Sequence, residues 1–303
     1  MRTMAPDAGF LGAPIETDPD QLGADVAILG VPFGWPYPRP GATAGCAVAP
    51  TAVRRRAARL ERFRGHWDFD IGGPMLPVDG APRIVDAGDV PGDATDGPGN
   101  AARIRDVVTR ILDRGAVPIC IGGDDSVPIP ILRAFAGRGP LTVLHVDAHL
   151  DFRDEVDGVR EGYSSSMRRA SEMAHVERVI HVGLRGVGSA READLEASRA
   201  AGNLLITARE LRARGVRAVL DELATSTSVF VSFDCDGLDP SVVAAVSAPA
   251  PGGLEFREAA DLLRGIGPRL AGAAFTELVP VLDVNEIGAL AVARLVTVLI
   301  GPR

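Results

Sequence analysis

The segment LTVLHVDAHLD, residues 141–151, decides the fold class of this chain and points to its chemistry. Its first part, LTVLHV, is an apolar run with the length and composition of a buried strand. Asp147, His149 and Asp151 follow at every second position, so we expect their side chains to point to one side of an extended segment. In open α/β sheets, ligands bind beyond the carboxyl ends of the strands. The segment therefore predicts a buried strand that ends at a binding site.

Apolar runs alternate with amphipathic segments along the rest of the chain. The apolar runs predict strands at residues 25–31, 83–86, 116–121, 141–146, 178–184, 204–207, 229–233 and 273–278. Predicted helices lie after Ser126 and at residues 51–64, 104–112, 190–201, 216–223, 256–263 and 286–300. Near-continuous apolar strands between helices are typical of a parallel sheet covered on both faces. We therefore predict the α/β class, with a three-layer αβα architecture around a central, mostly parallel sheet.

Pro118 and the N-terminus qualify this outline. Pro118 cannot donate a ladder hydrogen bond, which favours the start of its strand or an edge position. Residues 1–24 are rich in Pro and Gly and lack periodicity, so we expect an N-terminal arm that is mobile or forms an interface. Residues 25–303 contain no linker, repeat or low-complexity segment. They are expected to form a single α/β domain.

The charge balance excludes several classes of protein. The chain has 40 acidic residues and 32 basic ones, for a formal net charge of −8, and every basic residue is Arg. Enzymes that use a Schiff-base lysine are excluded, and a Walker-type phosphate loop would lack its Lys. Arg54-Arg55-Arg56 is the one basic run that stands out. The acidic balance therefore argues against a nucleic-acid partner.

The cysteines and the apolar segments favour a cytoplasmic protein. Cys46, Cys120 and Cys235 form no CxxC pair, so neither a disulfide framework nor a cysteine zinc site is indicated. The first residues show no signal-peptide pattern. The longest apolar run, residues 287–300, is short for a membrane span and contains Arg294. We expect a soluble, cytoplasmic protein without membrane contact.

Two further predicted strands also end in acids. Asp124 and Asp125 follow the strand at 116–121, and Asp234 and Asp236 follow the strand at 229–233. Such acids could merely cap helices or bind solvent, but three groups at strand ends should meet in one crevice. Carboxylates packed together without cations would protonate or disrupt the site. Two divalent ions resolve the conflict, and oxygen ligands with an imidazole suit Mn²⁺ best, with Mg²⁺, Fe or Ni²⁺ as alternatives.

These motifs resemble the arginase/agmatinase (ureohydrolase) family. The DAHxD motif at 147–151 and the SFDxDxxDP motif at 232–240 carry the resemblance, which extends from about residue 25 to 300. Further segments are similar to the family as well: Gly30–Phe33 with Arg39–Gly41, Asp86–Asp89 and Pro249–Leu254. The resemblance implies a parallel sheet between helices, a binuclear manganese site, a guanidino substrate and a homo-oligomer, either trimer or hexamer.

The resemblance also implies roles for single residues. Asp147 and Asp234 are similar to ligands shared by the two metals, and His149, Asp151 and Asp236 to the remaining ligands. In the hydrolase mechanism described below, Asp151 would also orient the nucleophilic hydroxide or accept its proton. Glu277 is similar to the glutamate that pairs with the guanidinium, a task that suits a carboxylate because it accepts a planar cation bidentately.

Two positions depart from the family pattern. Asp125 stands where the family usually has the metal-binding His of GGDHS. A carboxylate can still bind a metal, but its added negative charge should make that metal a weaker Lewis acid. Alternatively, one of the two metals is bound weakly or is a different element. Tyr163 stands where the family often has a proton-shuttling His. A tyrosine is a poor shuttle at neutral pH, and the neighbouring Glu161 could take that role.

Other polar and aromatic residues near the motifs have plainer interpretations. His145 precedes Asp147 by two residues on the same side of the strand, and we interpret it as packed or as lying behind the ligands rather than as a ligand. Trp35 and Tyr37 either wall the pocket or pack within their loop. We expect Cys120 and Cys235 to be small core residues, and Asp124 and Asp239 to be turn acids or to lie behind the ligands.

Three functional hypotheses follow. The first is a binuclear metal-dependent hydrolase, agmatinase-like, in which a metal-bound hydroxide attacks a guanidino or amidino carbon to release urea and an amine. The second is a non-catalytic or partner subunit of a ureohydrolase-type heteromer, which would bind fewer than one ion per chain. The third is a different metal-dependent amidohydrolase, for example a deacetylase of related fold with one zinc, although the pair Asp234 and Asp236 favours two metals. The substrate and the metal identity stay open at this point.

Overall fold

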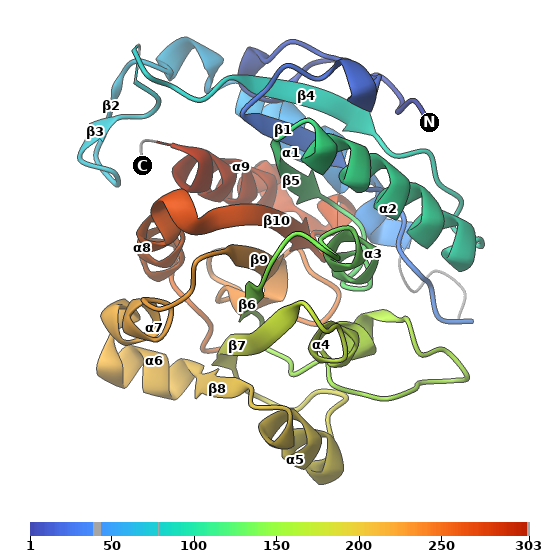
Figure 1. Cartoon of the computed structure of the whole chain (residues 1–303). Helices are drawn as coiled ribbons and strands as arrows, with labels where there is room; N and C mark the ends of the chain where they lie inside the picture. The colour runs from blue at the N-terminus through green and yellow to red at the C-terminus, as the bar shows by residue number, and fades with distance from the viewer. Residues whose placement is uncertain (39–43, 78, 302–303) are drawn as a thin grey trace.

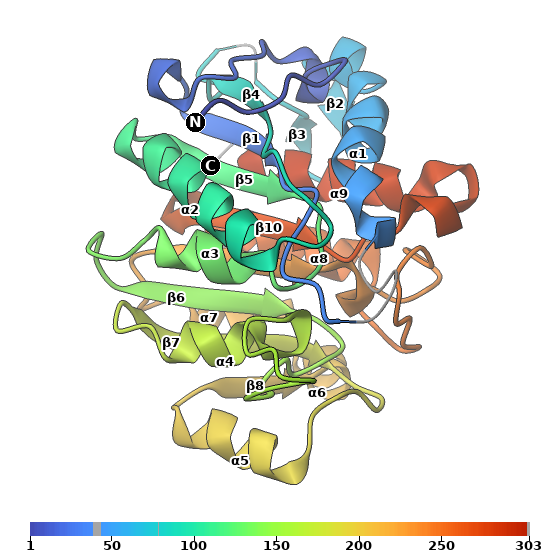
Figure 2. The same ribbon diagram turned by 90° about the vertical axis from the view of Figure 1, so that its right-hand side faces the viewer.

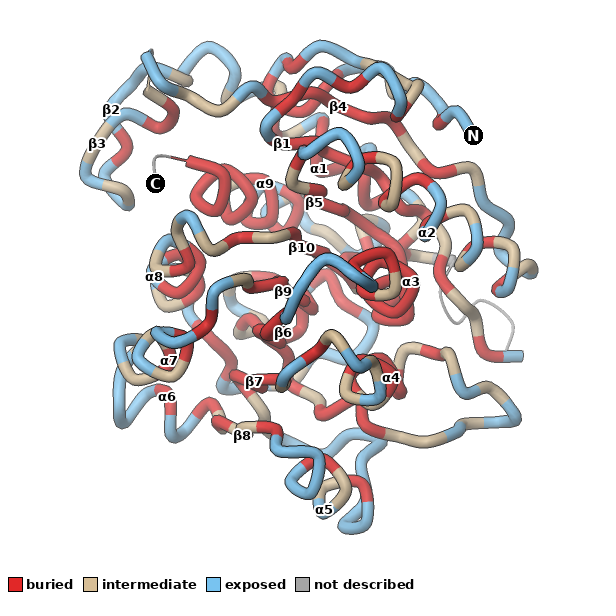
Figure 3. Tube along the Cα trace, viewed as in Figure 1, coloured by how far each residue is buried: buried red, intermediate tan, exposed pale blue. Residues whose placement is uncertain are grey.

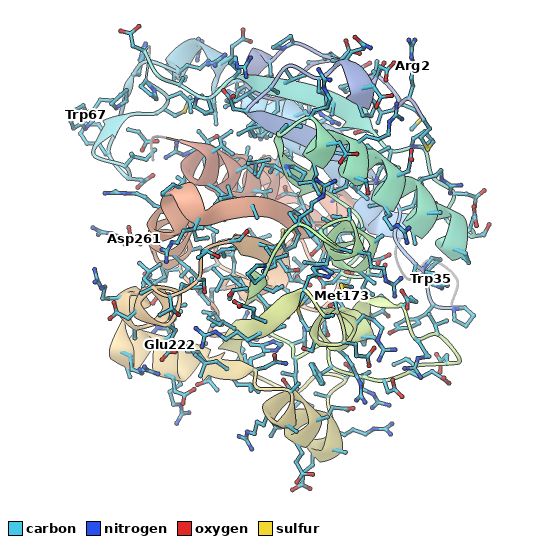
Figure 4. The ribbon with its side chains drawn as sticks, in the orientation of Figure 1. Arg2, Trp35, Trp67, Met173, Glu222 and Asp261 are labelled. Carbon is cyan, nitrogen blue, oxygen red and sulfur yellow. The ribbon has the colours of Figure 1, made fainter. Side chains whose placement is uncertain are left out.

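One central sheet organises the computed structural model, which describes residues 1–38, 44–77 and 79–301. The strand order is β4-β1-β5-β10-β9-β6-β7-β8, and all pairings between these strands are parallel. The strands are β1 (Val26–Gly30), β4 (Ile84–Asp89), β5 (Val117–Ile121), β6 (Leu141–Val146), β7 (Val176–Leu184), β8 (Leu204–Thr207), β9 (Val229–Asp234) and β10 (Leu270–Thr276). A short hairpin of β2 (Trp67–Asp68) and β3 (Gly73–Pro74) lies apart from the sheet, with Trp67 at the outer edge of the molecule (Figure 4).

Helices cover both faces of this sheet, as Figures 1 and 2 show. One face carries α2 (Gly97–Asp113), α3 (Pro128–Arg133), α4 (Ser166–Ser171) and α5 (Glu192–Ala200). The other face carries α1 (Ala49–Ala58), α6 (Ala208–Arg214), α7 (Val216–Glu222), α8 (Phe256–Ile266) and α9 (Ile287–Ile300). The predicted three-layer αβα architecture is therefore confirmed.

Each central strand contributes side chains to two separate apolar cores. In β1, Val26 and Ile28 join the core under α1 and α9, whereas Ala27 and Leu29 join the core under α2 and α3. All residues of β1, β6 and β9 are buried, and Figure 3 shows the strands in the interior. Burial on both faces explains why these strands are continuous apolar runs rather than alternating ones.

Pro118 lies at the start of its strand, one of the two places that the sequence analysis gave for it. It is the second residue of β5, as expected for a strand start, but β5 pairs with both β1 and β10 and is not an edge strand. Val117 N–H donates to Asp25 O on the β1 side, so the nitrogen of Pro118 faces β10. The pairing with β10 begins only at Ile119. The missing donor of Pro118 therefore removes no hydrogen bond from the ladder.

Several element boundaries differ from the prediction. The predicted helix at 51–64 ends at Ala58, and α2 begins earlier than expected because the Asp96 side chain caps it by accepting from Gly99 N–H at 2.9 Å. Helix α6 was not predicted. The last strand ends at Thr276 rather than at residue 278, which leaves Glu277 in a turn beyond the sheet.

The N-terminal segment lies along the β4 edge of the sheet (Figure 1). Met4 forms a bridge with Asp89, and Ile15 forms one with Asp86. Phe10 and Leu11 are fully buried in the core under α1. The segment expected to be an arm thus covers the edge strand of its own chain and removes an open edge from the sheet.

The longest apolar run forms α9 and belongs to the core. Most of its side chains are buried, and Arg294 pairs with Asp68 at 2.5 Å and with Asp70 at 2.8 Å. Among the described residues, no helix has both the length and the apolar character that crossing a membrane requires.

Candidate metal centre

Four neighbouring strands in the middle of the sheet end in acids. In the order β5-β10-β9-β6, Asp125 follows β5, Glu277 follows β10, Asp234 ends β9 and Asp147 follows β6. The sequence indicated three acidic strand ends, and the structure inserts β10 with Glu277 between them. Because parallel strands end at the same edge, these side chains share one crevice, which is where α/β sheets bind ligands.

The crevice is a cavity of about 360 Å³. Its lining includes residues predicted from the sequence: Asp125, His149, Asp151, Tyr163, Asp234, Asp236 and Glu277. Asp147 lies beneath them and is fully buried. Among the described residues no arginine lines the cavity, so the chain itself supplies no permanent cation there.

Turns rather than extended chain bring these ligands together. Asp147 Oδ1 accepts from His149 N–H at 2.5 Å, and Asp234 Oδ1 accepts from Asp236 N–H at 2.8 Å. Asp151 has φ +46°, in the left-handed region. The expected extended geometry is therefore wrong, because each first aspartate bends its own backbone into a turn. The turns bring His149 Nδ1 to 3.0 Å from Asp236 Oδ2, across two strands.

The potential donor atoms fall into two tight groups that share Asp147. One group contains Asp125, His145, Asp147 and Asp151, and the other contains Asp147, His149 and Asp236. Within each group, one nitrogen or oxygen atom per residue lies within 4.8 Å of all the others. Asp234 belongs to neither group but lines the same cavity. The groups have the donor types and the spacing to hold two cations through a common carboxylate.

Neutral donors hold the unexpected carboxylate at position 125. Asp125 Oδ1 accepts from the Thr276 hydroxyl at 2.9 Å, and Oδ2 accepts from the Ser166 hydroxyl at 2.6 Å. Its backbone N–H donates to Glu277 Oε1 at 2.9 Å. The side chain is 1% exposed and held by these contacts, and its carboxyl group belongs to the first of the two groups.

Burial and mutual repulsion favour protonated carboxyls in this cavity. Burial, with Asp147 nearby, raises the pKa of Asp125 to about 7 and that of Asp236 to about 6. The pKa values of Asp151 and Asp234 lie well above the ordinary value, also because of burial and then of neighbouring carboxylates. Such shifts are expected where like charges are gathered without a compensating cation.

For Asp147 and His149, by contrast, the surroundings favour the charged form of each side chain. Hydrogen bonding to Asp147 and Asp236 raises the pKa of His149 to about 10. Burial alone would raise the pKa of Asp147, but the neighbouring His145 and His149 lower it well below the ordinary value. Asp147 is thus held as an anion at the centre of the cluster, which suits a carboxylate that is shared between two cations.

Two buried atoms show that the residues fit a cation. His145 Nε2 and Asp147 Oδ2 lie 3.0 Å apart, and neither has a hydrogen-bond partner among the described residues. A buried acceptor without a partner is costly. Carboxylate oxygens with imidazole nitrogens are a donor set that Mn²⁺ and related divalent ions accept.

Comparison with known proteins agrees with this geometry. The model of the arginase family matches residues 24–301. The chain belongs to the arginase family. Guanidinopropionase of Pseudomonas aeruginosa is 32% identical to it over 289 residues, covering 93% of this chain and 86% of that protein. Mitochondrial agmatinase of Gallus gallus is 30% identical over 294 residues, covering 94% and 82%. The solved structure of proclavaminate amidino hydrolase from Streptomyces clavuligerus matches with a TM-score of 0.83 and 28% identity, covering 98% of this chain and 96% of that one.

Membership of the arginase family confirms the resemblance drawn from the motifs. Glu277, which resembles a glutamate of the family, has an unusual backbone conformation. Glu277 adopts φ +61°, a left-handed conformation that costs a non-glycine residue about 1–3 kcal/mol. Its N–H donates to Gly123 O at 3.0 Å, and its Oε2 lies 3.7 Å from Cys46 Sγ. Burial, and then Asp124, raises its pKa well above the ordinary value. The left-handed conformation ends the strand direction at Glu277, and the residue lines the cavity.

The two candidates for proton transfer lie in different surroundings. Tyr163 lines the cavity, and its ring meets that of Tyr37 edge-on at 4.4 Å between centroids. Glu161 instead pairs with Arg133 at 2.6 Å. The structure brings Tyr163 to the site but does not bring Glu161 there.

The loops around the cavity settle some of the plainer interpretations. Tyr37 packs behind Tyr163, whereas Trp35 lies against α2, toward the right of Figure 4, and does not line the cavity. Asp239 forms a turn by accepting from Ser241 N–H at 3.0 Å. Cys120 and Cys235 are buried free thiols, as expected. The segment Arg39–Gly41, which resembles a substrate loop of the family, lies outside the described residues.

Sequence reasoning missed three neighbours of the ligands. His181 on β7 contacts His145, and the two hydroxyl residues Ser166 and Thr276 hold Asp125. The signal for His145 was present, because it alternates with Asp147 along β6. The contact with His181 depends on the register of β6 with β7, which pairs His145 with His181 and which the sequence does not display.

Proposed function

We propose that this member of the arginase family is a hydrolase that uses two divalent cations, Mn²⁺ foremost with Ni²⁺ as the alternative, to cleave a guanidino compound into urea and an amine. One observation carries the proposal: the four central strands end at a cavity that is lined by Glu277 and by members of both donor groups. Several relatives are named agmatinase, guanidinobutyrase or guanidinopropionase. These names support a linear guanidino substrate.

The proposed ligands are the carboxylates and the imidazole that the sequence indicated. They are Asp125, Asp147, His149, Asp151, Asp234 and Asp236. When bound, such ions lower the pKa of water toward neutrality and so supply a nucleophile without a lysine or a cysteine. Asp147, held as an anion and shared by both donor groups, would be the central ligand.

Glu277 would bind the substrate. A carboxylate accepts a guanidinium through two parallel hydrogen bonds, which fixes the planar group in one orientation. Asp125 N–H already donates to Oε1 and so keeps the carboxylate from rotating. Pairing with a cationic substrate would restore the anion that burial disfavours. The same contact would select for a positively charged planar group.

Two residues would handle protons. Asp151 borders the cavity beside Asp147 and could hold the proton of the nucleophile. Tyr163 lines the cavity and could donate a hydrogen bond to the departing amine. We assign this second role to Tyr163 rather than to Glu161, because the Glu161 carboxylate is engaged by Arg133.

The experiment is a urea assay on Mn²⁺-loaded protein with linear guanidino compounds that end in an amine, in a carboxylate or in no charge. At least one compound should yield urea, and Glu277→Gln should lower kcat/KM by more than about 100-fold, since it removes a charged partner in a buried site. Asp261→Asn, an equivalent change at an exposed residue of α8, is the matched control. Absence of urea from every compound with metal bound, or acetate from an acetylated amine instead, would contradict the proposal.

We also propose that the chain forms a homo-oligomer, trimer or hexamer, in the cytoplasm. Large apolar side chains are exposed between the end of β10 and α9, including Val281, Leu282, Val284 and Ile287. Such a group of side chains is typical of a surface that another chain covers. Light scattering at micromolar concentration tests the assembly, and a monomer would contradict it.

A further inference from the structure

The two donor groups are built alike. Each contains Asp147 and one further carboxylate at least, and each contains a single imidazole: His145 in the first and His149 in the second. Asp125, Asp147 and Asp151 give the first group three carboxylates, and all four of its residues are buried. A divalent ion among three carboxylates and one imidazole would have a complete set of protein donors.

The inner nitrogen of His145 faces the carboxylate of Asp147. Nε2 and Asp147 Oδ2 lie 3.0 Å apart, a contact that is an ion pair when His145 is protonated, and neither atom has an aligned hydrogen-bond partner among the described residues. Both residues are 0% exposed. When His145 is neutral, both atoms carry lone pairs, and an ion placed between them could bind to both. The cost of an unpartnered buried nitrogen would then be removed.

The outer nitrogen of His145 is held by His181. The two Nδ1 atoms lie 2.9 Å apart, and the rings are nearly perpendicular, with an interplanar angle of 86°. A hydrogen bond from His145 Nδ1–H to His181 would leave Nε2 as the free acceptor. Imidazoles that bind metals usually donate their other N–H in this manner, which fixes the ring and its tautomer.

Asp125 cannot supply an imidazole, and its two oxygens already accept hydroxyl hydrogen bonds from Thr276 and Ser166. We propose that His145 Nε2 is a direct ligand of the ion in the first group, and that His181 is the positioning residue that holds its ring. This inference rests on the proposed function. It revises the interpretation of His145 as a residue behind the ligands.

Nuclear magnetic resonance with ¹¹³Cd²⁺ as the probe tests this directly. The chain has five histidines, so protein labelled with ¹⁵N in the imidazole rings gives a simple spectrum. Two imidazoles, His145 and His149, should show one-bond coupling to ¹¹³Cd. His145→Gln should remove one coupling and His149→Gln the other, while His66→Gln, a change at an exposed histidine, should remove neither. Coupling at His149 alone in the unmodified protein would overturn the proposal.

Manganese binding separates a ligand from a positioning residue. Equilibrium dialysis should show that His145→Gln weakens one of two Mn²⁺ sites by more than about 100-fold, whereas loss of a residue behind a ligand costs about 10–100-fold. His181→Gln should fall in that lower range and keep both ¹¹³Cd couplings. Equal affinity of His145→Gln and the unmodified protein for both ions would contradict the inference.

A folding control and the urea assay distinguish failure of this inference from failure of the proposed function. If His145→Gln does not fold, as circular dichroism would show, His149→Gln alone decides: one remaining coupling supports the proposal and none overturns it. The urea assay is run on the same preparations. Two coupled imidazoles without urea from any compound would refute the proposed function and leave this inference standing, and urea with only His149 coupled would do the reverse.

Discussion

Two groups of buried aspartates in this chain differ in how their charge is met. Asp86 within β4 and Asp89 at its end both contact Arg54 of α1, which is 3% exposed. Asp86 accepts from Arg54 Nε at 2.8 Å and from Nη2 at 2.9 Å, and Asp89 accepts from Nη1 at 2.5 Å. Phe10 N–H and Gly88 N–H complete the shell of Asp86. The chain thus neutralises this group with its own guanidinium.

The acids of the cavity have no such partner. Among the described residues no arginine lines it, the pKa values of Asp151 and Asp234 are strongly raised by burial and neighbouring carboxylates, and Asp147 Oδ2 has no hydrogen-bond partner. Asp86 is as buried as the cavity aspartates, so burial alone does not mark a site. The cavity acids are paired with the imidazoles of His145 and His149, which can lose their protons and leave the carboxylates to a divalent cation.

The largest expected effect is on the group that neutralises itself. Arg54→Met leaves Asp86 and Asp89 buried without their cation, which should lower the free energy of unfolding by about 3–5 kcal/mol. Urea denaturation followed by circular dichroism measures this. Arg55→Met, a change at the exposed neighbour, is the matched control and should cost little. A loss below about 1 kcal/mol for Arg54→Met would show that the pair is not structural.

Added cation should stabilise the other group. Mn²⁺ that binds only the folded protein should raise the free energy of unfolding by about 2.7 kcal/mol at 100 times its Kd. Thermal unfolding with and without Mn²⁺ measures the gain. Asp234→Asn should lose most of it, whereas Arg55→Met should keep it. An unchanged melting temperature at saturating Mn²⁺ would contradict the claim that the cavity carboxylates, unlike Asp86 and Asp89, bind a cation from solution.

The gain from Mn²⁺ should depend on pH. Burial raises the pKa of Asp125 to about 7 and that of Asp236 to about 6, above the value of these carboxyls in the unfolded chain. The folded, cation-free protein therefore binds extra protons, and its stability falls as the pH rises through these values. Because a cation replaces the protons, stabilisation by Mn²⁺ should be at least about 1.4 kcal/mol larger near pH 8 than near pH 5. Thermal unfolding at both pH values decides, and a larger gain at the lower pH would contradict the account.

The smallest effect is expected from the neutral donors around Asp125. Ser166→Ala removes one hydroxyl from the carboxylate and should cost about 1 kcal/mol of unfolding free energy, far less than the loss of Arg54. Ser247→Ala, at an exposed residue of the same cavity, serves as the control. If Ser166→Ala destabilised as strongly as Arg54→Met, the cavity would be held together by its own contacts rather than by a cation.

The fold was accessible from the sequence because its strands are buried on both faces. The continuous apolar runs at β1, β6 and β9 could be seen without any tertiary information. The acids at the ends of β5, β6 and β9 were equally visible, and they were expected to meet because parallel strands end at one edge of the sheet. The position of β5 between two other strands could not be predicted, because the side to which the nitrogen of Pro118 points depends on the register of the strands.

The site was predictable in composition but not in geometry. Spacing suggested an extended segment for Asp147 to Asp151, whereas side-chain hydrogen bonds to the backbone make turns. The contact between His145 and His181 depends on pairing between strands. Glu161 was adjacent to Tyr163 in sequence, but its ion pair with Arg133 involves a residue of α3. Each difference arises from contacts that sequence spacing does not encode.

Anomalous diffraction at the manganese edge from crystals grown with Mn²⁺ tests the central claim most directly. We expect two peaks at the cavity that share Asp147, one beside Asp125, His145 and Asp151 and the other beside His149 and Asp236. A single peak, or none, with Asp147 Oδ2 still unpartnered, would contradict it.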